Sequence, residues 1–420
     1  MKVCWICHFS NEGVRARLPL TRAGSRVADF APWITNLIQE FKSFDDVELH
    51  VIAPHWGLKT FTYEYVDQGV QYHFFKTEIP FLNRIWPSFF PLEAWTGYLW
   101  NRVRVRWFLR KIRPDLVNLM GAENAYYSST VLGIRRIPVL ISIQGIYSNP
   151  DRFKHAKPNP FLCKYERLVH AENRYFGVCA PFMPDLIKRD SPNPVLFWHD
   201  FPHKVEKLDI PDGSQKKYDF VFFSRVTFLK GACDILDALA LVKKCNPVVK
   251  LRMMGPVSRV FMEELKAKVA ALGLEGNVVL SGEYASHAEL LKEASLAKYY
   301  VLPTRLDTLP STIFEAIHLG LPVVSYKTGD IPVLNKGDLR VLLSPAANIE
   351  ALAGNMARLL DDPELGPCLS KKARDFLDKH FDNRRIARHF VDQYNAVLGH
   401  YYRQEEVPSP LLYENYMKDA

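Results

Sequence analysis

The sequence predicts a chain of two α/β domains, each built on a parallel sheet. Short apolar runs rich in strand formers alternate with segments of helical periodicity along both halves. With 420 residues, the chain is too long for one ordinary core. A polar, charged stretch from Pro202 to Lys217, with Pro211 and Gly213, separates the halves as a linker. Such alternation favours parallel sheets covered by helices on both faces.

In the first half, runs of strand-forming residues predict strands, and runs with helical spacing predict helices. The predicted strands are Val3–Phe9, Val47–Ala53, Val70–Lys76, Leu116–Met120 and Val139–Ile143. The predicted helices are Trp33–Phe41, which begins beside Pro32, and Arg102–Arg113, which ends at Pro114.

The second half repeats this pattern. Its predicted strands are Phe220–Phe223, Val249–Met254, Val278–Ser281, Tyr299–Leu302 and Val323–Ser325. Its predicted helices are Cys233–Lys243, Phe261–Leu272, Ala288–Leu296 and Ile313–Leu319, with a last helix over 383–402. We expect one domain over 1–200 and another over 201–384, with a helix and tail at 385–420 that pack back on the first domain.

Composition excludes several classes of protein. Hydrophobic content of 48% with 24% charged residues is normal for a globular domain. No apolar run reaches the roughly 18 residues that span a bilayer, and the N-terminus lacks the pattern of a signal peptide. The expected location is therefore cytoplasmic. A net charge of +8 suits a phosphorylated substrate or an anionic membrane surface, whereas no nucleic-acid-binding signature is present.

The cysteines favour a reducing compartment, because there are seven of them and they are scattered. Cys4 and Cys7 form a CxxC, but on a strand their odd offset points them to opposite faces. This predicts a buried, reduced pair rather than a metal or redox site.

Two polar loops of the second half carry the strongest chemical signal. One loop follows the predicted strand Phe220–Phe223 and bears Arg225 and Lys230, the cations that a diphosphate needs beside free amides. Two solvated surface cations are the alternative interpretation. The other loop bears Asp307, eight positions before Glu315 in the following helix. A loop that closes a strand and opens a helix is where α/β sheets bind ligands, so these residues outline a nucleotide-sugar site.

In the order of its motifs, the second half resembles the donor-binding domain of the retaining glycosyltransferases of family 4, which have the GT-B fold. The matching elements are Ser224-Arg225…Lys230-Gly231, Met254-Gly255-Pro256, Ser281-Gly282-Glu283, Asp307-x7-Glu315 and Gly320-Leu321-Pro322-Val323-Val324. The resemblance implies two Rossmann-like domains facing across a cleft, with the C-terminal helix crossing back to the N-terminal domain.

The resemblance also implies roles. Arg225 and Lys230 would hold the donor diphosphate, Glu315 the ribose hydroxyls and Asp307 the sugar hydroxyls. The remaining donor-binding positions are the amides of Thr308 and Leu309, which approach sugar and phosphate, and Gly255, Gly282, Glu283 and Tyr284, which flank the base.

Three departures from the family pattern bear on these roles. The first acid is Asp307 where the family has Glu, so its reach is one methylene shorter. Pro310 stands in the following loop and contributes no amide. The usual Gly-Gly after the last strand is Gly329-Asp330.

The first half matches less closely. Pro114–Glu123 and Pro138–Gly145 resemble two strands of the family, but Asn118, Met120 and Gln144 stand where His is frequent. Gln144 cannot be a base, although it can position a sugar hydroxyl or phosphate. Glu123 is the acid best placed at the cleft, with a helix-start carboxylate as the alternative. The candidate catalytic residues are Glu123, Gln144, Arg225, Lys230 and Asp307.

Two basic segments of the first half suggest further contacts. The loop from Ser10 to Ser25 and the residue beyond it carry arginines for acceptor or phosphate; these are Arg15, Arg17, Arg22 and Arg26. The segment from Ile79 to Arg113 combines aromatic residues with an arginine stripe suited to an anionic membrane. Its members are Phe81, Trp86, Phe89, Phe90, Trp95, Tyr98, Trp100 and Trp107, with Arg102, Arg106, Arg110 and Arg113. Solvated basic surfaces are the alternative for both segments.

The sequence therefore predicts a retaining glycosyltransferase that moves a sugar from a nucleotide-diphosphate donor to a glycan or lipid-linked acceptor, as in surface polysaccharide assembly. No metal or other cofactor is implied, since cations and helix amides can neutralise the leaving diphosphate. Contact with the inner face of the membrane is expected, and nucleic acid is not. The alternatives are a nucleotide-sugar epimerase of the same fold and a non-catalytic nucleotide-sugar-binding protein.

Overall fold

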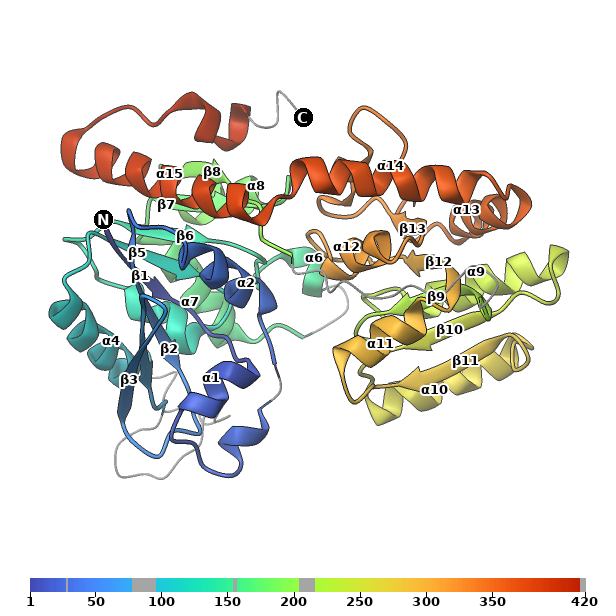
Figure 1. The fold of residues 1–420 in the computed structure, drawn as a ribbon, viewed down its shortest axis with the longest axis horizontal. Helices are drawn as coiled ribbons and strands as arrows, with labels where there is room; N and C mark the ends of the chain where they lie inside the picture. Colours follow the sequence, from blue (N-terminus) through green and yellow to red (C-terminus); the bar gives the residue numbers. More distant parts are fainter. Residues whose placement is uncertain (28, 78–95, 154–156, 204–215, 416–420) are drawn as a thin grey trace. The chain divides into compact units, whose positions relative to one another are not determined.

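The computed structural model describes residues 1–27, 29–77, 96–153, 157–203 and 216–415 (Figure 1). The chain divides into two compact units, Met1–Lys204 with Asp382–Ala420 (unit 1) and Val205–Phe381 (unit 2). Each unit has one sheet and one hydrophobic core. The prediction of two parallel-sheet α/β domains is confirmed. Most of the expected linker, residues 204–215, lies outside the described residues.

Unit 1 contains an eight-stranded sheet in the order β3-β4-β2-β1-β5-β6-β7-β8. Its strands are β1 Lys2–Ile6, β2 Glu48–Pro54, β3 Thr62–Asp67, β4 Val70–Phe75, β5 Leu116–Met120, β6 Val139–Ser142, β7 Tyr175–Val178 and β8 Val195–Trp198. All neighbours are parallel except β3 and β4, which pair antiparallel at the edge. The expectation of purely parallel strands was therefore wrong at this edge, where the tight turn at Gln68 and Gly69 forms a hairpin.

The helices of unit 1 connect these strands and cover the sheet. They are α1 Glu12–Arg17, η1 Gly24–Arg26, α2 Pro32–Phe41, α4 Leu99–Ile112, α5 Ala125–Ser128, η2 Ser129–Val131, α6 Pro150–Phe153, α7 Pro160–Ala171, α8 Met183–Asp190, α15 Asn383–Arg403 and η5 Ser409–Leu411. The stretch Ser10–Ser25 was expected to be a loop, but it contains α1. The Asn11 side chain caps this helix by accepting from the amide of Val14 at 2.8 Å.

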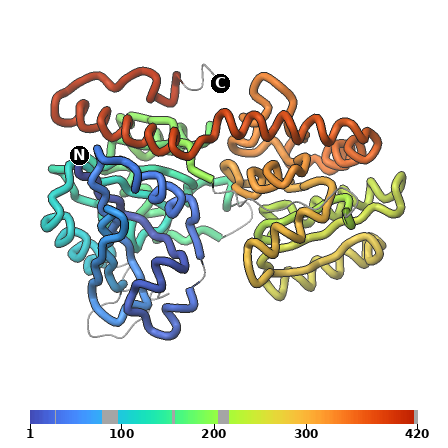
Figure 2. The backbone as a smooth tube through the Cα atoms, viewed as in Figure 1, coloured from blue at the N-terminus to red at the C-terminus, as the bar shows by residue number. Residues whose placement is uncertain are grey.

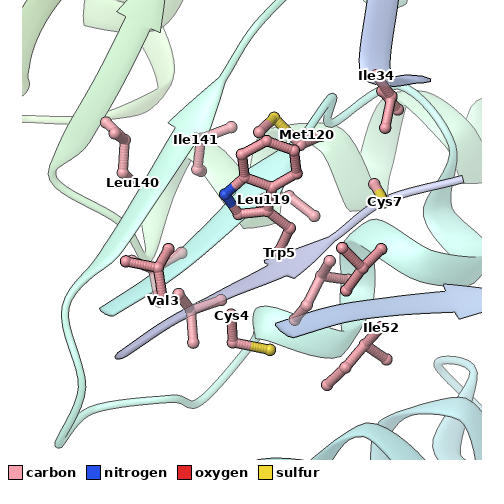
Figure 3. Close-up of a cluster of buried hydrophobic side chains, with 14 of the residues drawn as sticks. Val3, Cys4, Trp5, Cys7, Ile34, Ile52, Leu119, Met120, Leu140 and Ile141 are labelled. Carbon is pink, nitrogen blue, oxygen red and sulfur yellow. The ribbon is translucent and has the colours of Figure 1, made fainter. Parts of the chain in front are cut away.

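The core of unit 1 lies around β1, whose residues Val3 to Ile6 are fully buried (Figure 3). Strands covered on both faces read as continuous apolar runs, as β1 does. Cys4 and Cys7 are free, buried thiols, as predicted. Burial raises the pKa of both thiols, so neither is a ready nucleophile.

The C-terminal helix α15 belongs to unit 1, as predicted, and packs beside α2. In Figure 2 the red tube of α15 lies beside the blue N-terminal part of this unit. The hydroxyl of Tyr394 on α15 accepts from Trp5 Nε1 at 3.0 Å and from Asn118 Nδ2 at 2.7 Å, deep in the core. A polar contact between β1, β5 and α15 therefore fixes the register of this helix.

Unit 2 contains a six-stranded, all-parallel sheet in the order β11-β10-β9-β12-β13-β14. Its strands are β9 Tyr218–Phe223, β10 Leu251–Met254, β11 Val278–Gly282, β12 Ala297–Leu302, β13 Val323–Tyr326 and β14 Leu342–Ser344. Its helices are α9 Ala232–Cys245, α10 Arg259–Ala271, α11 His287–Ala294, α12 Ser311–His318, η4 Ile331–Asn335, α13 Ile349–Asp361 and α14 Leu365–His380.

The strand order of unit 2 is that of the doubly wound dinucleotide-binding fold, in which the first and fourth strands are neighbours. Here those strands are β9 and β12. After β9 the chain continues into one half of the sheet, and after β12 it continues into the other half. Ligands of such sheets bind at this switch point, beyond the carboxyl ends of the strands.

In the part of the chain that the structure describes, no helix has both the length and the apolar character needed to span a membrane.

Candidate active site

The two loops that sequence analysis singled out in unit 2 meet at its switch point. The loop after β9 carries Arg225 and Lys230, and the loop after β12 carries Asp307. The Lys230 ammonium forms an ion pair with Asp307 Oδ2, and Thr304 donates to the same oxygen at 3.2 Å. The Lys230 and Asp307 side chains are 25% and 18% exposed, so the pair is sheltered yet reachable from solvent.

Backbone contacts hold these loops together. The amide of Arg305 donates to the carbonyl of Leu229 at 2.8 Å, and the Thr304 hydroxyl also reaches that carbonyl. Gly231 has φ +79° and lies against Pro303, whose carbonyl oxygen would be 2.1 Å from an added Cβ. Only glycine fits this approach, which explains the Lys230-Gly231 pair in the sequence.

A third loop, after β13, supports the backbone at Asp307. Gly329 has φ +58°, and a Cβ there would lie 2.2 Å from the carbonyl oxygen of Asp307 and 2.4 Å from that of Thr308. The amide of Asp330 donates to the carbonyl of Thr308 at 3.0 Å. Within the described residues, the amides of Thr308 and Leu309 make no hydrogen bond, so both remain available to a ligand.

Behind the loop, Arg305 binds Asp234 of α9 through two hydrogen bonds. Nε and Nη2 of Arg305 donate to the two carboxylate oxygens at 2.9 and 2.7 Å, and the Tyr326 hydroxyl donates to the same acid at 3.0 Å. Asp234 is buried. Sequence analysis did not identify this support, because nothing in the spacing of residues 234, 305 and 326 signals that they meet.

Glu315 lies on α12, in the turn after the helix start at Ser311. Its Oε1 is 3.2 Å from Nε2 of His287, the first residue of α11, and its side chain is 12% exposed. Its other oxygen, Oε2, is buried without a hydrogen-bond partner among the described residues. A buried acceptor without a donor is costly, which suggests that ligand hydroxyls complete this site. Sequence analysis missed His287, although it stands at the helix start that follows the Gly282 motif.

The two carboxylates share a neighbour in Tyr300, on β12. Its hydroxyl donates to the carbonyl of Phe223 at 3.1 Å and lies 2.8 Å from the hydroxyl of Thr312. Burial raises the pKa of Tyr300 well above its usual value, and the charges of Glu315 and Asp307 act in the same direction. The Asp307 loop and the start of α12 therefore converge on the end of β12.

The positions predicted to flank the base lie at the ends of β10 and β11. Gly255 has φ +129°, lies against Ser224, and donates to the carbonyl of Gly282 at 2.7 Å. Glu283 is exposed. The Tyr284 hydroxyl accepts from Arg252 at 2.6 Å. These loops adjoin the loop after β9, because β9, β10 and β11 are consecutive in the sheet.

Arg225 is exposed at the end of β9, and no other described residue pairs with it. It is therefore a free cation within its loop, unlike Lys230.

In unit 1, the switch point lies between β1 and β5, and Glu123 follows β5. Its Oε2 is buried without a hydrogen-bond partner in the described part of the chain. Burial raises the pKa of Glu123 to about 7, and the nearby Glu166 acts in the same direction. The residue after β1 that faces this region is His8, which bonds the Tyr126 hydroxyl. Sequence analysis missed His8; its place after the first strand was the available signal.

Gln144 follows β6 and is half-buried. Its side chain makes no hydrogen bond within the described residues. Asn118, which stands where the resembled family frequently has His, is instead fully buried and bonded to Tyr394. It is a core residue rather than a site residue.

Some of the arginines in the two basic segments of unit 1 already have partners within the protein. Arg15 and Arg17 pair with Asp29 and Asp67, whereas Arg22 and Arg26 are exposed. On α4, Arg102 and Arg106 both donate to the carbonyl of Leu132. The apolar stripe of α4 is buried as predicted; it comprises Val105, Phe108, Leu109 and Ile112.

The exposed face of α4 includes several large apolar side chains. Leu99, Trp100, Val103 and Trp107 are each between 44% and 50% exposed. Of the other aromatic residues in the predicted membrane-binding segment, Tyr98 is half-buried, and the rest lie in 78–95, outside the described residues; they are Phe81, Trp86, Phe89, Phe90 and Trp95. Among the described residues, no three His, Cys, Asp or Glu side chains are grouped as a metal site.

Part of the chain matches a family of known proteins. Residues 205–376 match the family model described as Glycosyl transferases group 1. The provisionally named colanic acid biosynthesis glycosyltransferase WcaL of Escherichia coli strain K12 is 27% identical over 189 residues, which are 43% of this chain and 45% of WcaL. The chain spans less than half the length of the first curated relatives it matches.

Solved structures resemble nearly the whole chain. Sucrose-phosphate synthase (tll1590) from Thermosynechococcus elongatus has a TM-score of 0.70 at 15% identity, covering 94% of this chain and 98% of its own. Anabaena Alr3699/HepE, solved in complex with UDP, has a TM-score of 0.63 at 16% identity, covering 94% and 100%. At these identities the likeness concerns the fold. The chain therefore has the GT-B fold, and its residues 205–376 are similar to the Glycosyl transferases group 1 family.

Proposed function

We propose that this protein transfers a sugar from a nucleotide-diphosphate donor to a glycan or lipid-linked acceptor, with retention of the anomeric configuration. One observation carries the proposal: cationic and acidic side chains for a diphosphate, a sugar and a ribose converge at the switch point of unit 2. The group 1 family match to this unit and the UDP complex of Alr3699/HepE support a nucleotide-sugar donor.

In this proposal, each part of the donor has its own partner. Arg225, Lys230 and the free amides of Thr308 and Leu309 bind the diphosphate. Glu315, held by His287, accepts from the ribose hydroxyls. The lining of the base comes from the loops after β10 and β11, with Gly255, Gly282, Glu283 and Tyr284.

The chemistry needs stabilisation of the leaving diphosphate more than a protein nucleophile. As the bond between the anomeric carbon and the phosphate oxygen breaks, negative charge grows on the diphosphate. The cations and amides are fixed where that charge develops, and preorganised groups of this kind are effective. We propose front-face attack by the acceptor hydroxyl, whose proton passes to the departing phosphate, so that no metal or other cofactor takes part.

Glu123 and Gln144 are assigned to the acceptor side in this proposal. A carboxyl whose pKa lies near 7 can donate to or accept from an acceptor hydroxyl at neutral pH. Gln144 offers both a donor and an acceptor.

A setting in surface polysaccharide assembly is supported by the relative named for colanic acid biosynthesis. We assign membrane contact to the exposed face of α4 rather than to its arginine stripe. Trp100, Val103 and Trp107 recur at helical spacing on this face, and tryptophan favours the membrane interface. Exposed Arg110 is placed to contact anionic headgroups, whereas the neighbouring Lys111 pairs with Glu64 at 2.7 Å.

Release of nucleoside diphosphate from a panel of nucleotide sugars tests the proposed function. We expect slow donor hydrolysis by the wild-type chain, acceleration by the correct acceptor, and loss of both in Glu315→Ala and Lys230→Ala. An epimerase would convert the donor sugar without an acceptor. Binding with no release of nucleoside diphosphate under any acceptor would instead indicate a non-catalytic protein.

A further inference from the structure

The ion pair between Lys230 and Asp307 has a consequence for ligand selection. Both groups are predicted to contact the donor, yet in the structure they contact each other. Because the charges of the pair cancel, Lys230 presents no net charge to an incoming diphosphate. Arg225 is the cation of this loop that other described residues leave unpaired.

The contacts of Asp307 are unequal. Its Oδ2 is bound by both Lys230 and Thr304, whereas no described residue bonds Oδ1. The carboxylate therefore keeps one open acceptor while the other is held toward the cation. A sugar hydroxyl can bond the open oxygen, but a phosphate oxygen cannot, because both would be acceptors.

We propose that Asp307 is a competing counter-ion that makes this site discriminate between a nucleotide sugar and the bare nucleoside diphosphate. The diphosphate takes over Lys230 from Asp307. If a sugar is attached, its hydroxyls donate to the released carboxylate and offset the lost ion pair. If no sugar is attached, the carboxylate is left as an unpaired negative charge beside the phosphate, which costs free energy in a sheltered site.

This inference rests on the proposed function and adds a preference of the site for the substrate over the product. The substrate would be favoured over the product of the same nucleotide, which speeds release of the nucleoside diphosphate after transfer. Gly329 and Asp330 hold the backbone that carries the Asp307 carboxylate in place.

Titration calorimetry on the full chain tests the inference with the pairs UDP and UDP-glucose, GDP and GDP-mannose, and ADP and ADP-glucose. In Asp307→Asn, we expect the affinity for the nucleoside diphosphate to rise about threefold to tenfold, the range for removing a half-buried ion pair of this kind. Affinity for the nucleotide sugar should fall or stay constant, so the ratio of the two affinities drops. If Asp307 only held the loop in place, Asp307→Asn should instead weaken binding of both ligands.

Three control variants sharpen this test. Glu315→Gln should weaken both ligands by the same factor, because both contain the ribose. Glu275→Gln removes an exposed acid before β11, at the opposite edge of the sheet, and should change neither affinity. In a Lys230→Met background, Asp307→Asn should no longer produce the full rise, because the competition is gone.

The outcomes separate the two proposals. If no nucleotide binds the wild-type chain, the proposed function fails and the inference fails with it. A different result is that nucleotides bind and their affinity depends on Glu315 and Lys230, but Asp307→Asn lowers the affinity for the nucleoside diphosphate or leaves it unchanged. Lys230 then binds the Asp307 carboxylate and the diphosphate at the same time. The inference is then wrong while the proposed function stands.

Discussion

Arg305 and Asp234 join the donor loop to helix α9 through a two-bond fork in which the acid is buried. Arg305 lies two residues before Asp307 in the donor loop. The position of this loop therefore depends on Asp234 of α9, more than 70 positions earlier in the chain. Tyr326 on β13 binds the same carboxylate. Buried contacts of Asp234 therefore hold the loop that carries the partly exposed Asp307.

Asp234→Ala should destabilise unit 2 by about 2–4 kcal/mol, because it leaves Arg305 and the Tyr326 hydroxyl without their partner. Far-UV circular dichroism in urea measures the loss. All eight tryptophans lie in residues 1–204, so tryptophan fluorescence follows unit 1 and should be unchanged. Asp237→Ala, one turn along the same helix, breaks only a surface pair with Lys268 and should cost less than about 1 kcal/mol. Equal losses in the two variants would contradict this role for Arg305.

Gly329→Ala should impair nucleotide binding because a Cβ cannot fit against the carbonyl oxygens of Asp307 and Thr308. The loop must move, and the carboxylate moves with it. Gly337→Ala is the matched control: its φ is +76°, but nothing lies within 4 Å of an added Cβ. It should cost about 1 kcal/mol of stability from the left-handed backbone alone and leave nucleotide affinity intact. Calorimetry and thermal unfolding of both variants distinguish contact from backbone strain.

Glu123 should make the stability of unit 1 depend on pH. Its pKa is about 7 in the folded chain, above the 4.5 of an ordinary glutamate, so between these two pH values the folded state keeps a proton that the unfolded state loses. Stability is therefore fully present below pH 4.5 and falls as pH rises to about 7, by about 3 kcal/mol at most. Glu123→Gln should flatten that part of the profile. Urea denaturation followed by tryptophan fluorescence at pH 5 and pH 8 measures the difference, and an identical pH dependence in both proteins would refute it.

Tyr394→Phe should destabilise unit 1 by about 2–4 kcal/mol, because the indole of Trp5 and the amide of Asn118 both lose their buried acceptor. Tyr401→Phe, later in the same helix, removes a hydrogen bond to the carbonyl of Arg135 near the surface and should cost about 0.5 kcal/mol or less. Tryptophan fluorescence in urea compares the two. Similar costs would mean that α15 does not depend on this buried contact.

The sequence predicted the two-domain α/β fold because its buried strands are continuous apolar runs, which local pattern shows directly. β5 was predicted at its observed bounds, and the carboxyl-terminal ends of β9, β11 and β12 were placed within a residue, although the starts of β9 and β12 were predicted two residues late. The antiparallel strand β3 was missed because it is a short, half-buried edge strand without a continuous apolar run.

The candidate site was predicted only as far as motifs reach. Arg225, Lys230, Asp307 and Glu315 carry a recognisable spacing. The residues that orient them, His287, Asp234 and Arg305, come from separate elements and meet through tertiary packing, which no local pattern encodes. The same is true of His8 and Tyr126 in unit 1.

The central claim is that Lys230 and Glu315 form one donor site in unit 2. Calorimetry with the best-bound nucleotide sugar on the wild-type chain, Lys230→Met and Glu315→Ala tests it most directly. We predict measurable binding by the wild-type chain and a loss of at least about tenfold in each variant, with thermal unfolding of the protein unchanged. Nucleotide-sugar affinity that is the same in all three proteins would contradict the claim.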